Sequence, residues 1–112
     1  MTKPPITWAD FEKIDIRIGT IEKVEIFEKA KKPAYQLWIN FGELGTKKTS
    51  SQLTELYLPE ELLEKQVVAV VNFPPKQIAN FMSECLVLGA VEGKDVILLE
   101  PMTRAKNGLP IA

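Results

Sequence analysis

Short segments in which apolar and polar residues alternate, each followed by a turn signal, constrain this chain more than any other feature. Apolar residues occupy every second position in residues 14–18 and 35–41. A period of two residues is the pattern of half-buried β-strands. Turn signals recur roughly every 8–12 residues, which is typical of all-β barrels and sandwiches. For 112 residues we therefore predict one domain, residues 1–112, folded as an all-β, five-stranded OB-type barrel.

The remaining elements follow from local signals. Thr7 as N-cap, with Asp10 three residues later, predicts a short N-terminal helix over residues 7–12. The alternation slips after Gly19, which suggests a bulge that bends the first strand. We expect further strands at 47–53, 66–73, 85–92 and 95–101, a short helix opened by Pro59, and a helical or irregular stretch at 76–83. A terminal strand at the end of the chain is also compatible with the pattern.

What the sequence lacks excludes several kinds of chemistry. It has no histidine and a single cysteine, Cys85, which excludes imidazole catalysis, an internal disulfide and a cysteine-built zinc site. No glycine-rich phosphate loop occurs. Two carboxylate pairs and a serine–lysine pair are nominal catalytic groups: Asp10 with Asp15, Glu60 with Glu61, and Ser50 or Ser51 beside Lys47 and Lys48. Helix capping explains the carboxylates better, and solvation explains the lysines better. We predict no enzymatic activity, no cofactor and no metal.

The apolar segments are also too short for a membrane. The first eight residues contain no apolar signal region, and the longest apolar run covers only residues 85–91. A spanning helix needs about 18 apolar residues. We therefore expect no membrane insertion, no signal peptide and a cytoplasmic location.

Charge is distributed unevenly along a chain whose net charge is only −1. Residues 23–48 carry a local excess of lysine, and residues 55–64 are acidic. If Lys31, Lys32, Lys47 and Lys48 converge, they form a patch for an anionic ligand, with Ser50 and Ser51 donating to phosphate. The same lysines could instead keep an edge strand soluble. Composition favours neither interpretation.

A second group of candidate residues is apolar. Trp38 falls on the opposite face of its strand from the core residues, and Phe73, Pro74, Phe81 and Met82 surround an irregular segment. Such residues suit adaptable apolar binding or base stacking. A second small core or a dimer interface is the alternative, and the pattern taken alone favours it.

Apolar residues also mark both ends of the chain. Trp8 and Phe11 lie near the start, and Leu109 and Ile111 near the finish. A small domain gains from burying such residues against a second copy. We therefore predict a homodimer whose interface contains these four side chains.

Several ordered segments resemble one known family. Residues 8–25 (WADFEKIDIRIGTIEKVE) resemble the opening of the tRNA-binding OB-fold domain found in methionyl-tRNA synthetases and in stand-alone relatives. Residues 29–42, 47–57 and 67–89 are closer to a subgroup of those relatives described as export-related chaperones. The resemblance covers essentially the whole chain. It implies an OB barrel, a homodimer built by terminal extensions, and no enzymatic activity.

The resemblance also assigns site residues. In the tRNA-binding relatives, a basic residue and a serine on the third strand and a later S-E-G-M block are associated with RNA contact. Lys47, Ser51, Ser83 and Glu84 match these positions, whereas Cys85 and Leu86 replace the glycine and the methionine. The FPP sequence at residues 73–75 also replaces a more basic stretch. These departures favour peptide binding over tight tRNA docking.

Two functions are therefore predicted. The first is a chaperone whose partners are unfolded or export-destined polypeptides or the export machinery, and which binds through Trp38, Phe73, Pro74, Phe81 and Met82. The alternative is structure-specific tRNA binding through Lys31, Lys32, Lys47, Lys48, Ser51 and Ser83.

Overall fold

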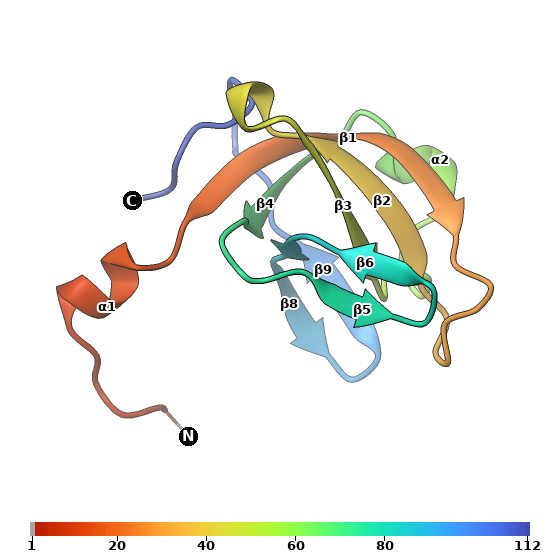
Figure 1. The fold of residues 1–112 in the computed structure, drawn as a ribbon, viewed down its shortest axis with the longest axis horizontal. Coiled ribbons are helices and arrows are strands. Elements are labelled where there is room, and N and C mark those ends of the chain that lie inside the picture. Colours follow the sequence, from red (N-terminus) through yellow and green to blue (C-terminus); the bar gives the residue numbers. More distant parts are fainter. Residues whose placement is uncertain (1) are drawn as a thin grey trace.

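The main body of the protein is a sheet of five strands that curls into a nearly closed barrel (Figure 1). The computed structural model describes residues 2–112. The strand order is β3-β2-β1-β4-β7, and every pairing is antiparallel. These strands span Ile16–Ile26 (β1), Tyr35–Asn40 (β2), Thr46–Ser51 (β3), Gln66–Val70 (β4) and Leu86–Val87 (β7). The predicted five-stranded barrel is confirmed.

Strand β1 holds the barrel together because it serves partners on both sides. Its first half pairs with β4, and its second half pairs with β2. The register to β2 shifts between Ile21 and Lys23, so the predicted bulge exists, three residues beyond Gly19. Gly19 itself serves packing: a Cβ at this position would lie 2.6 Å from Ile39 and 2.7 Å from the Phe41 ring. Only glycine lets those two side chains approach the strand so closely.

The barrel interior is filled by the inward residues of the alternating strands. In β2 the buried positions are Tyr35, Leu37 and Ile39, with Phe41 following, while Trp38 on the other face is only partly buried. Val67 and Ala69 of β4 and Leu62 complete the centre. The predicted assignment of Trp38 to the outer face is confirmed.

Two short helices and a 3₁₀ turn lie outside the sheet: α1 (Trp8–Glu12), α2 (Pro59–Leu62) and η1 (Gly42–Leu44). Thr7 caps α1 as predicted, since its hydroxyl accepts from the Asp10 N–H while the Asp10 carboxylate accepts from the Thr7 N–H. The helix stands away from the barrel, on the same side as the C-terminal end of the chain (Figure 1). None of the helices formed by residues 2–112 is long and apolar enough to cross a membrane.

Residues 76–83 are a β-hairpin, so the predicted helical or irregular stretch is wrong there. β5 (Lys76–Ile78) pairs with β6 (Phe81–Ser83) across a two-residue turn. Ala79 adopts a φ of 52° in that turn. Alanine rarely adopts this left-handed conformation, so an alanine at this position gives no sequence signal for a turn. A second hairpin joins β8 (Gly89–Glu92) to β9 (Asp95–Leu98), with the predicted turn at Gly93.

The end of the chain returns to the beginning of β1. The Ile18 N–H donates to the Leu109 carbonyl, and the Ile111 N–H donates to the Ile16 carbonyl. Arg17 and Pro110 form a single antiparallel bridge. The C-terminal segment thus covers the edge of β1 that β2 leaves free, which agrees with a short terminal strand.

Candidate binding face

Three strands place Trp38 between two lysines on the outer face of the sheet. Lys23 on β1 and Lys48 on β3 are the direct cross-strand partners of Trp38 on β2. The Lys23 ammonium lies 4.5 Å from the centre of the indole ring, within the range of a cation–π contact. Lys23 belongs to no predicted set, because its pairing with Trp38 depends on the bulge in β1.

The indole ring is supported from below by other aromatic side chains. Phe81 stands edge-on to Trp38 at 5.9 Å between ring centres, and Phe27 lies 5.4 Å from Phe81. Phe27, Ala34 and Phe81 form a small core separate from the barrel interior. Phe81 is only 7% exposed, and its ring packs against Trp38. The alternative that the sequence pattern favours for these residues, a second small core, is therefore confirmed for Phe81, and its direct contact with a ligand stays a prediction. We call Lys23, Trp38, Lys48 and their two supporting phenylalanines the aromatic face.

The other predicted apolar contacts do not lie beside Trp38 on this face. Met82 alternates with Phe81 along β6, so its exposed side chain is on the opposite side of the hairpin. Phe73 and Pro74 are exposed in the loop that precedes β5. The structure therefore joins Trp38 with Phe81, and leaves Phe73, Pro74 and Met82 as separate exposed apolar groups.

The predicted lysine patch is also divided. Strand alternation puts Lys48 on the face of Trp38, whereas Lys47 and Ser51 pair with the buried residues Ile39 and Tyr35 and so belong to the other face. Lys31 and Lys32 are exposed in the turn between β1 and β2. Only Lys48 of these four has its ammonium against an aromatic ring, 4.9 Å from the centre of Phe81.

The block at residues 83–85 closes the barrel, and its polar groups are engaged there. The Glu84 N–H donates to the Lys48 carbonyl at 2.8 Å, and the Glu84 carboxylate accepts from the Lys48 N–H at 2.9 Å. The Ser83 hydroxyl accepts from the Ser50 N–H and lies 2.9 Å from the Thr49 hydroxyl, which donates to the Cys85 carbonyl. We call this contact of residues 48–50 with residues 83–85 the barrel seam. The barrel seam fixes the backbone of Lys48 and engages the Ser83 hydroxyl; contact of Ser83 with RNA stays a prediction.

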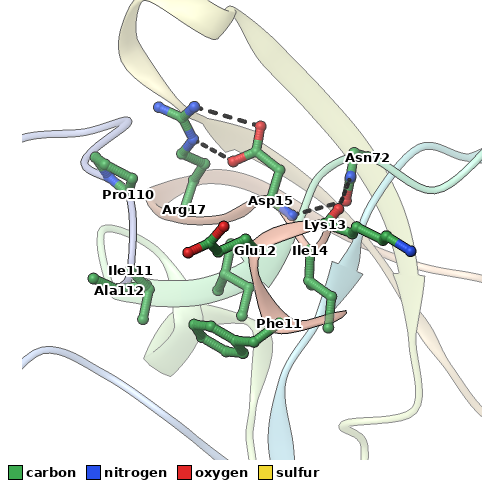
Figure 2. Close-up of a pocket in the computed structure, with 11 residues that line it drawn as sticks. Phe11, Glu12, Lys13, Ile14, Asp15, Arg17, Asn72, Pro110, Ile111 and Ala112 are labelled. Atoms are coloured by element: carbon green, nitrogen blue, oxygen red, sulfur yellow. Dashed lines mark hydrogen bonds and ion pairs between the residues drawn. The ribbon is translucent and has the colours of Figure 1, made fainter. Parts of the chain in front are cut away.

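The two ends of the chain meet around a groove of about 460 Å³ (Figure 2). Phe11, Ile14 and Ile111 supply its apolar wall, and Arg17, paired with Asp15 at 2.6 Å, lines another part. Arg17 also donates to the Gly108 carbonyl, which ties the C-terminal segment to β1. Two of the predicted interface residues, Phe11 and Ile111, therefore share one surface, which we call the terminal groove. Trp8 is 87% exposed.

Comparison with known protein families shows the family to which this chain belongs. The family described as "Putative tRNA binding domain" matches residues 16–110. The chain belongs to this tRNA-binding domain family. Within it, methionine–tRNA ligases are similar: that of Methanococcoides burtonii is 38% identical over 107 residues, and that of Listeria monocytogenes is 32% identical over 109. These matches cover 95% and 96% of this chain but only 16% of each ligase.

Solved structures match the whole barrel. The CsaA chaperone of Bacillus anthracis is 50% identical, with a TM-score of 0.94 over 97% of this chain and all of that one. The CsaA chaperone of Picrophilus torridus is 54% identical, with a TM-score of 0.92 over 96% of this chain and all of that one. A protein of Pyrococcus horikoshii related to methionyl-tRNA synthetase shares the fold, with a TM-score of 0.86 at 22% identity. These likenesses confirm the OB-type barrel.

Three of the nominal catalytic carboxylates of this tRNA-binding domain are engaged in local contacts. Asp10 caps α1, Asp15 pairs with Arg17, and the Glu61 carboxylate accepts from the Leu58 N–H. Burial raises the pKa of the Cys85 thiol from 9.0 to about 12, although the Thr49 hydroxyl and the Lys47 charge oppose the shift. A thiol with so high a pKa is a poor nucleophile. Among residues 2–112, no group of three or more acidic, cysteine or histidine side chains could hold a metal ion.

Proposed function

We propose that this protein is a non-enzymatic, homodimeric chaperone of the CsaA type that binds apolar segments of unfolded or export-destined polypeptides in the cytoplasm. The full-length likeness to two proteins named as CsaA chaperones supports the proposal. The matched region covers only 16% of each methionine–tRNA ligase.

The observation that carries the proposal is the aromatic face. Trp38 is partly exposed, is held by Phe81 and Phe27, and lies between Lys23 and Lys48. A supported aromatic ring offers apolar contact area without needing to become ordered on binding. The exposed Phe73 and Met82 offer further apolar contacts elsewhere on the surface. Such separate contacts suit weak, sequence-tolerant binding of an extended chain.

Titration with an unfolded protein tests this function. Fluorescence anisotropy of a labelled unfolded protein follows binding, so that variants with and without Trp38 are measured in the same way. We expect saturable binding of a permanently unfolded, carboxymethylated protein. Trp38→Ala should weaken binding about tenfold or more, since aromatic anchors carry much of the energy of an interface. Met102→Ala is the control, because Met102 is a fully exposed apolar residue outside the strands that form the aromatic face and outside the proposed dimer interface. The absence of saturable binding would refute the proposal.

The proposed homodimer rests on the two ends of the chain. Trp8 is almost fully exposed, and the terminal groove beside it is lined by Phe11, Ile14 and Ile111. We propose that these apolar surfaces, with Leu109, are buried against a second copy. Sedimentation at micromolar concentration should give a dimer for the native chain, and Trp8→Ser with Ile111→Ser should shift it toward monomer. A native monomer would contradict this assembly.

A second candidate function is tRNA binding, which the family match over residues 16–110 favours. Lys31, Lys32 and Lys48 are available to phosphates, and Lys47 lies at the other face of β3. Filter binding across a salt series distinguishes this function. If it holds, tRNA affinity falls steeply with salt, and replacing both Lys31 and Lys32 with alanine lowers the logarithmic slope by about 2. Replacing Lys65 and Lys94 is the charge-matched control.

A further inference from the structure

Lys23 has an arrangement that the proposed function does not explain. Its ammonium lies over the Trp38 ring at 4.5 Å and, at the same time, 3.1 Å from the Glu25 carboxylate. Glu25 is two residues along the same strand and therefore on the same face of β1. The Lys23 and Glu25 side chains are 56% and 50% exposed. Lys23 thus covers the part of Trp38 that a ligand would need, and only solvent-exposed contacts hold it there.

We propose that Lys23 is a specificity-determining residue that leaves Trp38 when a polypeptide binds and pairs with an acidic side chain of that polypeptide. This inference rests on the proposed polypeptide-binding function and names the chemistry of the segment that is bound. Glu25 occupies in the free protein the place that the ligand carboxylate takes in the complex. Exposed ion pairs and exposed cation–π contacts are weak, so Lys23 can be displaced readily.

The register of the strands gives the expected pattern in the bound segment. Lys23 and Lys48 lie on either side of Trp38, one strand away in each direction. Neighbouring strands are about 4.8 Å apart, so the two lysine backbones are separated by about 10 Å, which an extended chain covers in about three residues. We therefore expect the preferred segment to place an apolar residue against Trp38. One acidic residue precedes it and one follows it, and these two acidic residues are about three positions apart.

Fixed charges around Trp38 are consistent with this preference. Lys48 lies on the other neighbouring strand with its ammonium over Phe81, and its backbone is fixed by Glu84 at the barrel seam. Glu25 is the acidic group paired with Lys23, whereas the Glu84 carboxylate is engaged by the Lys48 N–H. Removing the Glu25 charge should therefore free Lys23 for a ligand without disturbing the seam.

Three labelled peptides with the same apolar centre test the inference. Aspartate, asparagine or lysine flanks that centre, and fluorescence anisotropy measures each dissociation constant for the full chain. We expect the aspartate peptide to bind most tightly. Lys23→Gln should reduce its advantage over the asparagine peptide by about threefold or more, the size of one exposed charge contact. Glu25→Gln should strengthen binding of the aspartate peptide by about twofold to fivefold. Lys94→Gln and Glu92→Gln, at the β8–β9 turn, are the charge-matched controls for Lys23→Gln and Glu25→Gln. Neither control should change the preference for the aspartate peptide.

The outcomes separate this inference from the proposed function. If the peptides bind but Lys23→Gln and Lys94→Gln give the same aspartate preference, Lys23 has no specificity role and the inference is overturned. If no peptide binds the native chain while tRNA does, the polypeptide-binding function is overturned and the inference with it. Acrylamide quenching tests, without a ligand, whether Lys23 shields the Trp38 ring. In a Trp8→Phe background, Lys23→Ala should make the Trp38 fluorescence easier to quench. Unchanged quenching would contradict the described contact.

Discussion

Replacing Thr49 with valine should test how much of the stability of the barrel depends on its seam. Thr49 is 1% exposed, and its hydroxyl donates to the Cys85 carbonyl at 2.7 Å and lies 2.9 Å from the Ser83 hydroxyl. Valine has nearly the same shape but cannot make either bond. A buried polar group that loses its partner costs about 1–3 kcal/mol. For a domain of this size each kcal/mol lowers the melting temperature by roughly 5 °C.

Urea unfolding followed by circular dichroism measures the effect, at one fixed protein concentration because a dimer would make stability concentration-dependent. Thr46→Val is the control on the same strand, since Thr46 is exposed and its hydroxyl lies 3.5 Å from Glu22. That substitution should change the free energy of unfolding by less than about 0.5 kcal/mol. Equal unfolding midpoints for the two variants would show that the hydroxyl contacts at the seam contribute nothing, and our account of barrel closure would be refuted.

Two further substitutions test the core. Gly19→Ala should lower the free energy of unfolding by about 1–3 kcal/mol through overpacking, because the new methyl group would meet Ile39 and Phe41. Adding Phe41→Leu should restore part of this loss, as measured by thermal unfolding. A Gly19→Ala variant as stable as the native chain would contradict the described packing. Cys85 should make stability fall at high pH. The unfolded thiol loses its proton near pH 9.0 and the folded thiol only near 12, so the unfolded state binds fewer protons between these values. The free energy of unfolding should drop there by about 1.4 kcal/mol per pH unit, and Cys85→Ala should reduce this slope; an identical slope in both proteins would count against the raised pKa.

Much of the barrel could be predicted because its signals are local. The alternation in residues 35–41 places Leu37 inside and Trp38 outside, and a one-residue change of register would reverse both. The α1 cap follows from Thr7 and Asp10 alone. The hairpin at residues 76–83 could not be predicted in this way, because its turn forces Ala79 to a positive φ and tertiary packing of Phe81 supplies the compensation.

The candidate site was predictable only in part, because it depends on distances between strands. Alternation places Trp38 on the outer face, but the sequence leaves Phe81 open between a binding contact and a second small core, because the pattern does not reveal the hairpin that buries it. Lys23 was missed, since the bulge between Ile21 and Lys23 decides which β1 residue faces Trp38. The role of Ser83 was likewise hidden, because its partners Thr49 and Ser50 lie far away along the chain.

The position of β1 also determines the order in which this protein can assemble. Its residues find partners in β2, then in β4, and finally in the segment around Leu109. During synthesis the first strand is made early, yet its last neighbour leaves the ribosome only when nearly all of the described chain exists. Contacts between such distant residues close slowly. An incomplete chain therefore lacks the hydrogen-bond partners that residues 108–111 supply to the Ile16–Ile18 edge.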